Sequence, residues 1–132
     1  MFDPMSGTRV WIASEIHPQH GGDMEAARTM ILQSKLGGAN AVKVQLYDTM
    51  ALHGNLDKTY LQMDRDEFED LKKYADGIGI ELFASVFDEE RLRWCEELGA
   101  KRYKIASRTV EDQALCQAII ETGKPVMISL GM

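Results

Sequence analysis

Short apolar stretches with the two-residue period of a β-strand alternate with amphipathic stretches along this 132-residue chain. Parallel strands need a long crossover, usually a helix, so the alternation predicts β-α-β units and a parallel sheet. Two α/β architectures fit: an open doubly wound sheet, or the first five strands of a (β/α)8 TIM barrel. The first strand is not followed by a glycine-rich loop with dinucleotide spacing, which argues against a Rossmann domain. We expect strands at 10–16, 41–47, 80–87, 102–107 and 126–131, and helices at about 23–36, 66–77, 88–98 and 109–122.

Polar residues mark where the helices begin. Asp23 and Asp88 each precede a helix pattern, where a carboxylate can accept bonds from the free N–H groups of the first turn. Thr109 and Asp112 have the spacing of a capping box, which predicts that the last helix opens at Thr109. Residues 48–62 form a long connection without a clear period, and such a connection in a compact domain is either functional or mobile.

The strand predicted at 41–47 carries a lysine and an amide on one face. Val42 and Val44 alternate with Lys43 and Gln45. Lysine is depleted in strands, and a buried charge is costly unless it is paired. Lys43 therefore faces an anion if the strand is central, or solvent if the strand lies at an edge.

The other predicted strands also carry polar residues toward their C-terminal ends. The βα loops and helix N-termini of a parallel sheet or barrel converge at that edge, where ligands bind. Taken singly, Ser85 or Ser129 is more often an ordinary strand residue, and Lys104 beside Arg102 also fits a solvated edge. Together, the lysines, hydroxyls and amide suit a small phosphorylated ligand, and the one carboxylate is a candidate general base. The set is Glu15, Lys43, Gln45, Ser85, Lys104, Ser107 and Ser129.

The composition narrows the class of protein. The net charge of −6 argues against a general nucleic-acid surface, so an anion site would be a local basic pocket. Cys95 and Cys116 lie in helix patterns without metal-ligand spacing, as expected for reduced thiols of a cytoplasmic protein. Residues 1–4 do not resemble a signal peptide, and no apolar run approaches the roughly 20 residues of a membrane span.

Two histidines follow the first strand within a predicted turn. Glu15, His17 and His20 have a spacing that could suggest a metal site, but no partner that would orient the histidines can be assigned from the sequence. The alternative is that His20, rather than His17, donates a hydrogen bond to a substrate.

Five segments of the chain are similar to motifs of the sialic acid synthase family, which condenses phosphoenolpyruvate with N-acylmannosamine or a related sugar. Residues 14–23 resemble Ala-Glu-Ile-Gly-x-Asn-His-x-Gly-Asp, and 41–45 resemble Ala-Val-Lys-Phe-Gln. Residues 84–88 resemble Ser-Thr-Pro-Phe-Asp, and 103–109 resemble Tyr-Lys-Ile-Ala-Ser-Gly-Glu. Residues 123–132 resemble Gly-Lys-Pro-Val-x-x-Ser-Thr-Gly-Met. The five segments are in register and span nearly the whole chain.

The resemblance implies a (β/α)8 barrel in which Glu15 and His20 are candidate catalytic residues and Thr109 is a candidate sugar contact. It implies a divalent metal, manganese or magnesium, whose ligands lie outside this chain, and a homodimer for the full-length enzyme. It also implies that the phosphoenolpyruvate is held by Lys43, Gln45, Ser85, Lys104, Ser107 and Ser129.

The sequence departs from the motifs where a sugar contact is expected, because Arg108 and Thr109 replace Gly and Glu. A full barrel takes about 250 residues, so we expect residues 1–132 to be the N-terminal portion of the barrel domain, without its second half and without the family's antifreeze-like domain. Such a fragment would itself be inactive. The alternatives are a half-barrel that binds a phosphorylated ligand without turnover, and a 3-deoxy-octulosonate or 3-deoxy-heptulosonate synthase.

Overall fold

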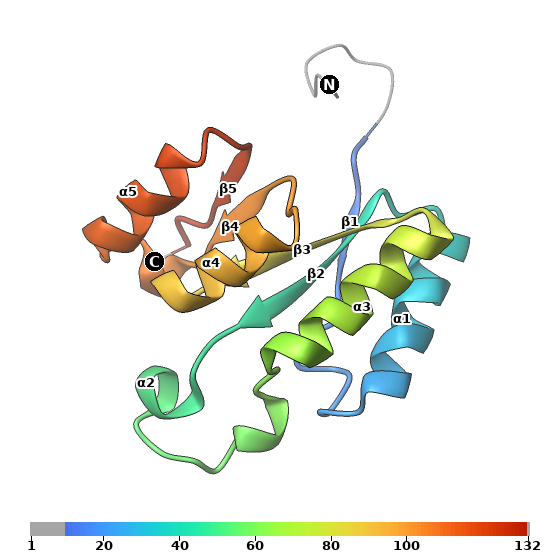
Figure 1. The fold of residues 1–132 in the computed structure, drawn as a ribbon, viewed down its shortest axis with the longest axis horizontal. Helices are drawn as coiled ribbons and strands as arrows, with labels where there is room; N and C mark the ends of the chain where they lie inside the picture. The colour runs from blue at the N-terminus through green and yellow to red at the C-terminus, as the bar shows by residue number, and fades with distance from the viewer. Residues whose placement is uncertain (1–9, 132) are drawn as a thin grey trace.

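The computed structural model describes residues 10–131, in which strands and helices alternate (Figure 1). Residues 1–4 and the last residue of the fifth motif, Met132, lie outside this range. The strands are β1 (Ala13–Glu15), β2 (Ala41–Leu46), β3 (Glu81–Val86), β4 (Tyr103–Ile105) and β5 (Val126–Ile128). The α-helices are α1 (Met24–Leu36), α2 (Thr49–His53), α3 (Arg65–Ile78), α4 (Glu89–Glu97) and α5 (Gln113–Glu121), and the 3-10 turns are η1 (Thr59–Leu61) and η2 (Ser107–Thr109).

The strand order decides between the two architectures that the sequence allows. The strands lie in the sheet in chain order, β1-β2-β3-β4-β5, and every neighbouring pair is parallel. A doubly wound sheet reverses its direction of winding, whereas this sheet does not. Because β-α-β crossovers are right-handed, a sheet wound in one direction carries its helices on one face. The described chain is therefore a half-barrel, as the barrel alternative predicted.

The outer face of the sheet packs against the helices. Val42 and Val44 of β2 and Phe68 and Leu71 of α3 have no exposed surface. Helices α1 and α3 lie side by side over this part of the sheet (Figure 1). Burial of such side chains contributes about 1.5–3 kcal/mol each. The same alternation turns Lys43 toward the opposite, concave face.

The caps confirm most of the predicted helix starts. Asp23 accepts hydrogen bonds from the N–H groups of Glu25 and Ala26, and Asp88 accepts one from Arg91. The capping box expected at Thr109 is wrong. Residues 107–109 form η2, the Thr109 hydroxyl donates to the carbonyl of Ala106 at 2.9 Å, and Asp112 caps α5 instead.

The connection at 48–62 contains more regular structure than the sequence indicated. Asp48 caps the short helix α2, which ends at Gly54, a glycine with a φ of 72°. The side-chain oxygen of Gln62 accepts a hydrogen bond from the N–H of Thr49 at 2.7 Å and closes the segment on itself. In Figure 1 this segment lies beyond the C-terminal end of β2.

The described strands and helices also bear on two other sequence expectations. Cys95 lies in α4 and Cys116 in α5, and both are free thiols. Among residues 10–131 no helix combines the length and the apolar character that crossing a bilayer requires.

At the two edges of the sheet, Ile12 and Ile128 are about half exposed, at 53% and 50%.

Candidate functional site

The register of the sheet brings the predicted polar residues to one face. Glu15 pairs with Lys43 across β1 and β2, and Gln45 pairs with Ser85 across β2 and β3. Ser85 in turn pairs with Lys104 across β3 and β4. Residues directly opposite one another in a ladder point to the same side, so these side chains share the concave face.

Lys43 is held in place by partners on both neighbouring strands. Its ammonium forms an ion pair with the carboxylate of Glu15 and donates a hydrogen bond to the Ser85 hydroxyl at 3.2 Å. Only 14% of the Lys43 side chain is exposed. The other oxygen of Glu15 accepts the N–H of His17 at 3.0 Å. The carboxylate therefore orients both the lysine and the loop that follows β1.

Lys104 lies near this ion pair as a second cation. Burial, and then the positive charge of Lys43, lower the pKa of Lys104, while the carboxylate of Glu15 opposes the shift. Among residues 10–131 no hydrogen bond or ion pair joins its ammonium to another side chain. An anion placed between Lys43 and Lys104 would relieve their repulsion and supply the missing acceptor.

Glu15, Lys43 and Lys104 border a concave pocket of about 220 Å³, called the lysine pocket below. Phe83 and Met127 give it an apolar wall that sequence reasoning missed. Alternation along each strand could have indicated both, because Phe83 lies two residues before Ser85 and Met127 two residues before Ser129. In the structure Phe83 lies opposite Lys43, and Met127 opposite Lys104. The lining residues are Ala13, Ser14, Glu15, Lys43, Phe83, Lys104, Met127, Ile128 and Ser129.

Other predicted site residues lie around this pocket without lining it. The Ser85 hydroxyl accepts a hydrogen bond from Lys43, which separates it from the pocket. Ser107 lies close to Gly131, in the segment after β5. Gln45 lies farther along β2, where its amide approaches the carbonyl of His17 at 3.5 Å. Thr109 is buried and borders a different hollow.

His17 and His20 form a buried chain of hydrogen bonds. The N–H of Gly22 donates to Nδ1 of His20 at 3.0 Å, so Nε2 of His20 carries its proton and donates to Nδ1 of His17, also at 3.0 Å. Nε2 of His17 then donates to the hydroxyl of Tyr47 at 3.2 Å. His20 therefore contacts His17 rather than the lysine pocket.

This histidine chain does not suit a metal ion. Every ring nitrogen of His17 and His20 already has a hydrogen-bond partner. Among residues 10–131 no three His, Cys, Asp or Glu side chains gather closely enough to hold a cation. The described residues thus do not fit the divalent metal that the sequence resemblance implies.

The buried His17 predicts a pH-dependent stability. Burial, followed by the charges of His20 and Lys43, lowers the pKa of His17 from 6.5 to about 4. Between these values the unfolded chain binds the proton and the folded protein does not, so stability falls as the pH falls. The loss is up to about 3 kcal/mol, and the lowered pKa of His20 acts in the same direction.

Urea unfolding at a series of pH values measures this loss. We expect His17→Asn to flatten the profile between pH 6.5 and 4, whatever its stability at pH 7. His53→Asn, at an exposed histidine, serves as the control and should keep the wild-type slope. Equal slopes for His17→Asn and the wild type would contradict the assignment.

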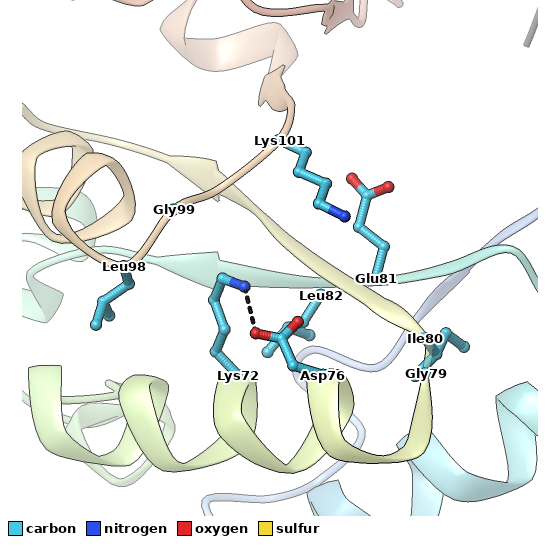
Figure 2. A pocket seen from close by; sticks show the side chains of 9 residues that line it. All are labelled: Lys72, Asp76, Gly79, Ile80, Glu81, Leu82, Leu98, Gly99 and Lys101. Atoms are coloured by element: carbon cyan, nitrogen blue, oxygen red, sulfur yellow. Dashed lines mark hydrogen bonds and ion pairs between the residues drawn. The ribbon is translucent and has the colours of Figure 1, made fainter. Parts of the chain in front are cut away.

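The largest described cavity lies at the other end of the sheet. It has a volume of about 550 Å³ and is bordered by Gly79 and Gly99, where α3 and α4 end (Figure 2). Lys72 there forms an ion pair with Asp76 at 2.8 Å. Ligands of parallel sheets bind at the C-terminal ends of strands, so this N-terminal cavity is the weaker candidate despite its size. Its exposed Lys101 provides a control position remote from the lysine pocket.

Comparison with known proteins gives consistent matches. The profile described as NeuB family matches residues 30–132. The chain is 30% identical to the uncharacterized protein MJ1065 of Methanocaldococcus jannaschii, with 96% of this chain and 39% of that protein covered. It is 29% identical to the human N-acetylneuraminate-9-phosphate synthase, with 92% and 39% covered.

A solved structure matches closely as well. The N-acetylneuraminic acid (sialic acid) synthetase of Leptospira borgpetersenii, in complex with citrate, superimposes with a TM-score of 0.90 at 31% identity. The match covers 95% of this chain and 46% of that one. The chain spans about two fifths of the length of the two curated relatives, 39% in each case.

Proposed function

Because the chain belongs to the NeuB family, we propose that its lysine pocket binds phosphoenolpyruvate. The observation that carries the proposal is that Lys43 and Lys104 line the same pocket on the concave face. The one carboxylate in that lining, Glu15, is already bound to Lys43. The ligand is a small dianion or trianion with a phosphate and a carboxylate. Two ammonium groups and the hydroxyl of Ser129 match those two ends.

We propose further that the pocket serves the condensation of phosphoenolpyruvate with an N-acylmannosamine-type sugar. The C3 carbon of phosphoenolpyruvate attacks the aldehyde carbon of the open-chain sugar, water adds to C2, and the resulting tetrahedral intermediate expels phosphate. Lys43 and Lys104 stabilise the charge on the departing phosphate. Glu15 positions Lys43, and Phe83 keeps water from one side of the pocket.

The complete reaction needs groups beyond the described residues. We propose that β1 and β5 pair with further strands of a closed barrel, where their half-exposed edge side chains Ile12 and Ile128 are covered. The divalent cation of the family would be held by residues outside 10–131. A protein that carries this half-barrel in a closed barrel should release phosphate from phosphoenolpyruvate only when the sugar is present, and no release would reject the condensation.

Ligand titration tests the pocket directly. We expect the chain to bind phosphoenolpyruvate more tightly than pyruvate, which lacks the phosphate, or inorganic phosphate, which lacks the carboxylate. Isothermal titration calorimetry gives the three affinities, and amide chemical shifts locate the contacts on β2 and β4. Equal affinity for phosphoenolpyruvate and phosphate would mean that the pocket recognises a phosphate alone.

A further inference from the structure

A second pocket lies beyond the C-terminal end of β2, next to the lysine pocket. It has a volume of about 180 Å³ and is formed by the loop after β1, the end of β2, the 48–62 connection and the turn after β4. Its lining residues are His17, Pro18, Gln45, Tyr47, Leu52, His53, Lys58, Leu61, Phe87 and Arg108.

The charged side chains that line this pocket are all basic. Lys58 and Arg108 contribute positive charge, and the lining contains no aspartate or glutamate. Within residues 10–131 neither cation forms an ion pair with a carboxylate. One nitrogen of the Arg108 guanidinium donates to the carbonyl of Leu52 at 2.9 Å, which fixes the side chain and leaves its other N–H donors for a ligand.

Carboxylates close to Arg108 are already engaged elsewhere. Arg108 also borders a hollow that contains Asp48 and Asp88. Asp48 accepts the N–H of Ala51 at the start of α2, and Asp88 accepts the N–H of Arg91 at the start of α4. Asp88 also pairs with Arg91, and within residues 10–131 neither carboxylate forms an ion pair with Arg108.

The base of the pocket is aromatic. The ring of Tyr47 packs edge-on against His17, His53 and Phe87, with ring centroids 5.4, 5.7 and 5.9 Å away. Burial raises the pKa of Tyr47 and lowers the pKa of His17 to about 4, so both are neutral at pH 7. The aromatic base therefore supplies shape and the basic rim supplies charge.

We propose that this second pocket binds an anionic group, phosphate or carboxylate, carried by the acceptor sugar. The inference rests on the proposed function, because it assigns the acceptor end of the same reaction. Gln45 lies two residues beyond Lys43 on the same face of β2, which separates their Cα atoms by about 7 Å. His17 lines the second pocket and its N–H donates to Glu15 of the lysine pocket, so the two pockets are neighbours on this face. In this proposal one sugar reaches from the lysine pocket into the second pocket.

Three sugar probes distinguish the sources of the charge. N-acetylmannosamine 6-phosphate carries a phosphate, N-acetylmannosaminuronic acid carries a carboxylate, and N-acetylmannosamine carries neither. Each is titrated by calorimetry into the chain with and without phosphoenolpyruvate. We expect at least one anionic sugar to bind about tenfold or more tightly than the neutral one, since a charge-assisted contact is worth that factor.

Two variants and a control link the preference to this pocket. Arg108→Gln and Lys58→Gln should each remove most of the preference for the anionic sugar and leave phosphoenolpyruvate affinity unchanged. Lys58 is exposed and makes no side-chain cap bond in η1, so its variant is informative even if loss of the Arg108–Leu52 bond disturbs the fold. Lys101→Gln, at the opposite end of the sheet, should keep the preference.

The outcomes separate the two proposals. Equal affinity for all three sugars, no binding of any of them, or an unchanged preference in both variants would overturn the second pocket. If the wild-type chain did not bind phosphoenolpyruvate but still preferred an anionic sugar, the proposed function would be rejected and the second pocket would stand. A preference for the phosphate or for the uronate identifies which anion the acceptor carries.

Discussion

Lys43→Met is expected to weaken phosphoenolpyruvate binding by about 100-fold or more, equivalent to about 3 kcal/mol. Lys43 is the best-fixed cation of the lysine pocket, because Glu15 and Ser85 hold its ammonium from both sides. Its removal takes away a positive charge and leaves the Glu15 carboxylate to repel the ligand. Titration of variant and wild type with phosphoenolpyruvate measures the loss.

The matched control is Lys101→Met, which removes the same charge from an exposed residue at the other end of the sheet. Its affinity should equal that of the wild type, so an effect of net charge alone is excluded. Ser85→Ala should weaken binding less, because it removes only one partner of Lys43. Affinity in Lys43→Met within about threefold of the wild type would reject the assignment of this pocket to phosphoenolpyruvate, since that factor is less than 1 kcal/mol.

Gly22→Ala is expected to destabilise the fold by about 3 kcal/mol or more. Gly22 has a φ of 82°, a left-handed conformation that costs other residues about 1–2 kcal/mol. A Cβ at this position would also overlap the backbone carbonyl of Tyr60 in η1. The backbone of one loop or the other must move, which adds about 1–3 kcal/mol, as overpacking does.

The neighbouring glycine separates these two effects. Gly21 also has a positive φ, 62°, but a Cβ there would meet no atom within 4 Å. Gly21→Ala should therefore cost only the conformational part, about 1 kcal/mol. Midpoints of urea unfolding give both losses. Equal losses would show that the contact between Gly22 and Tyr60 is unimportant to stability.

The contact at Gly22 also connects stability to the site. It seats the loop after β1, which contains His17, against the 48–62 connection, which contains Lys58. Both segments line the second pocket. A partly folded Gly22→Ala protein should thus lose binding of anionic sugars before it loses binding of phosphoenolpyruvate, whose lysine pocket is built on the strands themselves.

Much of the local structure was predictable because its causes are local. The period-2 alternation at 41–47 placed Lys43 on one face and Val42 on the other, and the structure shows the same. Asp23 and Asp88 start helices because a carboxylate just before a helix meets free N–H groups. Thr109 misled the prediction because η2 uses its hydroxyl, a choice that depends on the turn after β4.

Parts of the candidate site could not be predicted because their causes are distant in the chain. The sequence supplied His17 and His20 but not the bond to Tyr47, 30 residues from His17, that makes them a buried chain. It marked Arg108 as a departure from a motif, yet only the fold places Arg108 against the carbonyl of Leu52, 56 residues away. The 48–62 connection has no regular hydrophobic period, so its sequence did not indicate that it lines the second pocket.

The sequence by itself determined the alternation of strands and helices, the faces on which the polar residues lie, and the family to which the chain belongs. Only the tertiary structure decided that the sheet is wound in one direction, that Lys43 and Lys104 border one pocket, and that a second basic pocket adjoins it. The physical reason is that propensity, alternation and capping act over a few residues. Strand order and register arise from contacts between residues far apart in the chain, which bring separately ordinary side chains to one rim.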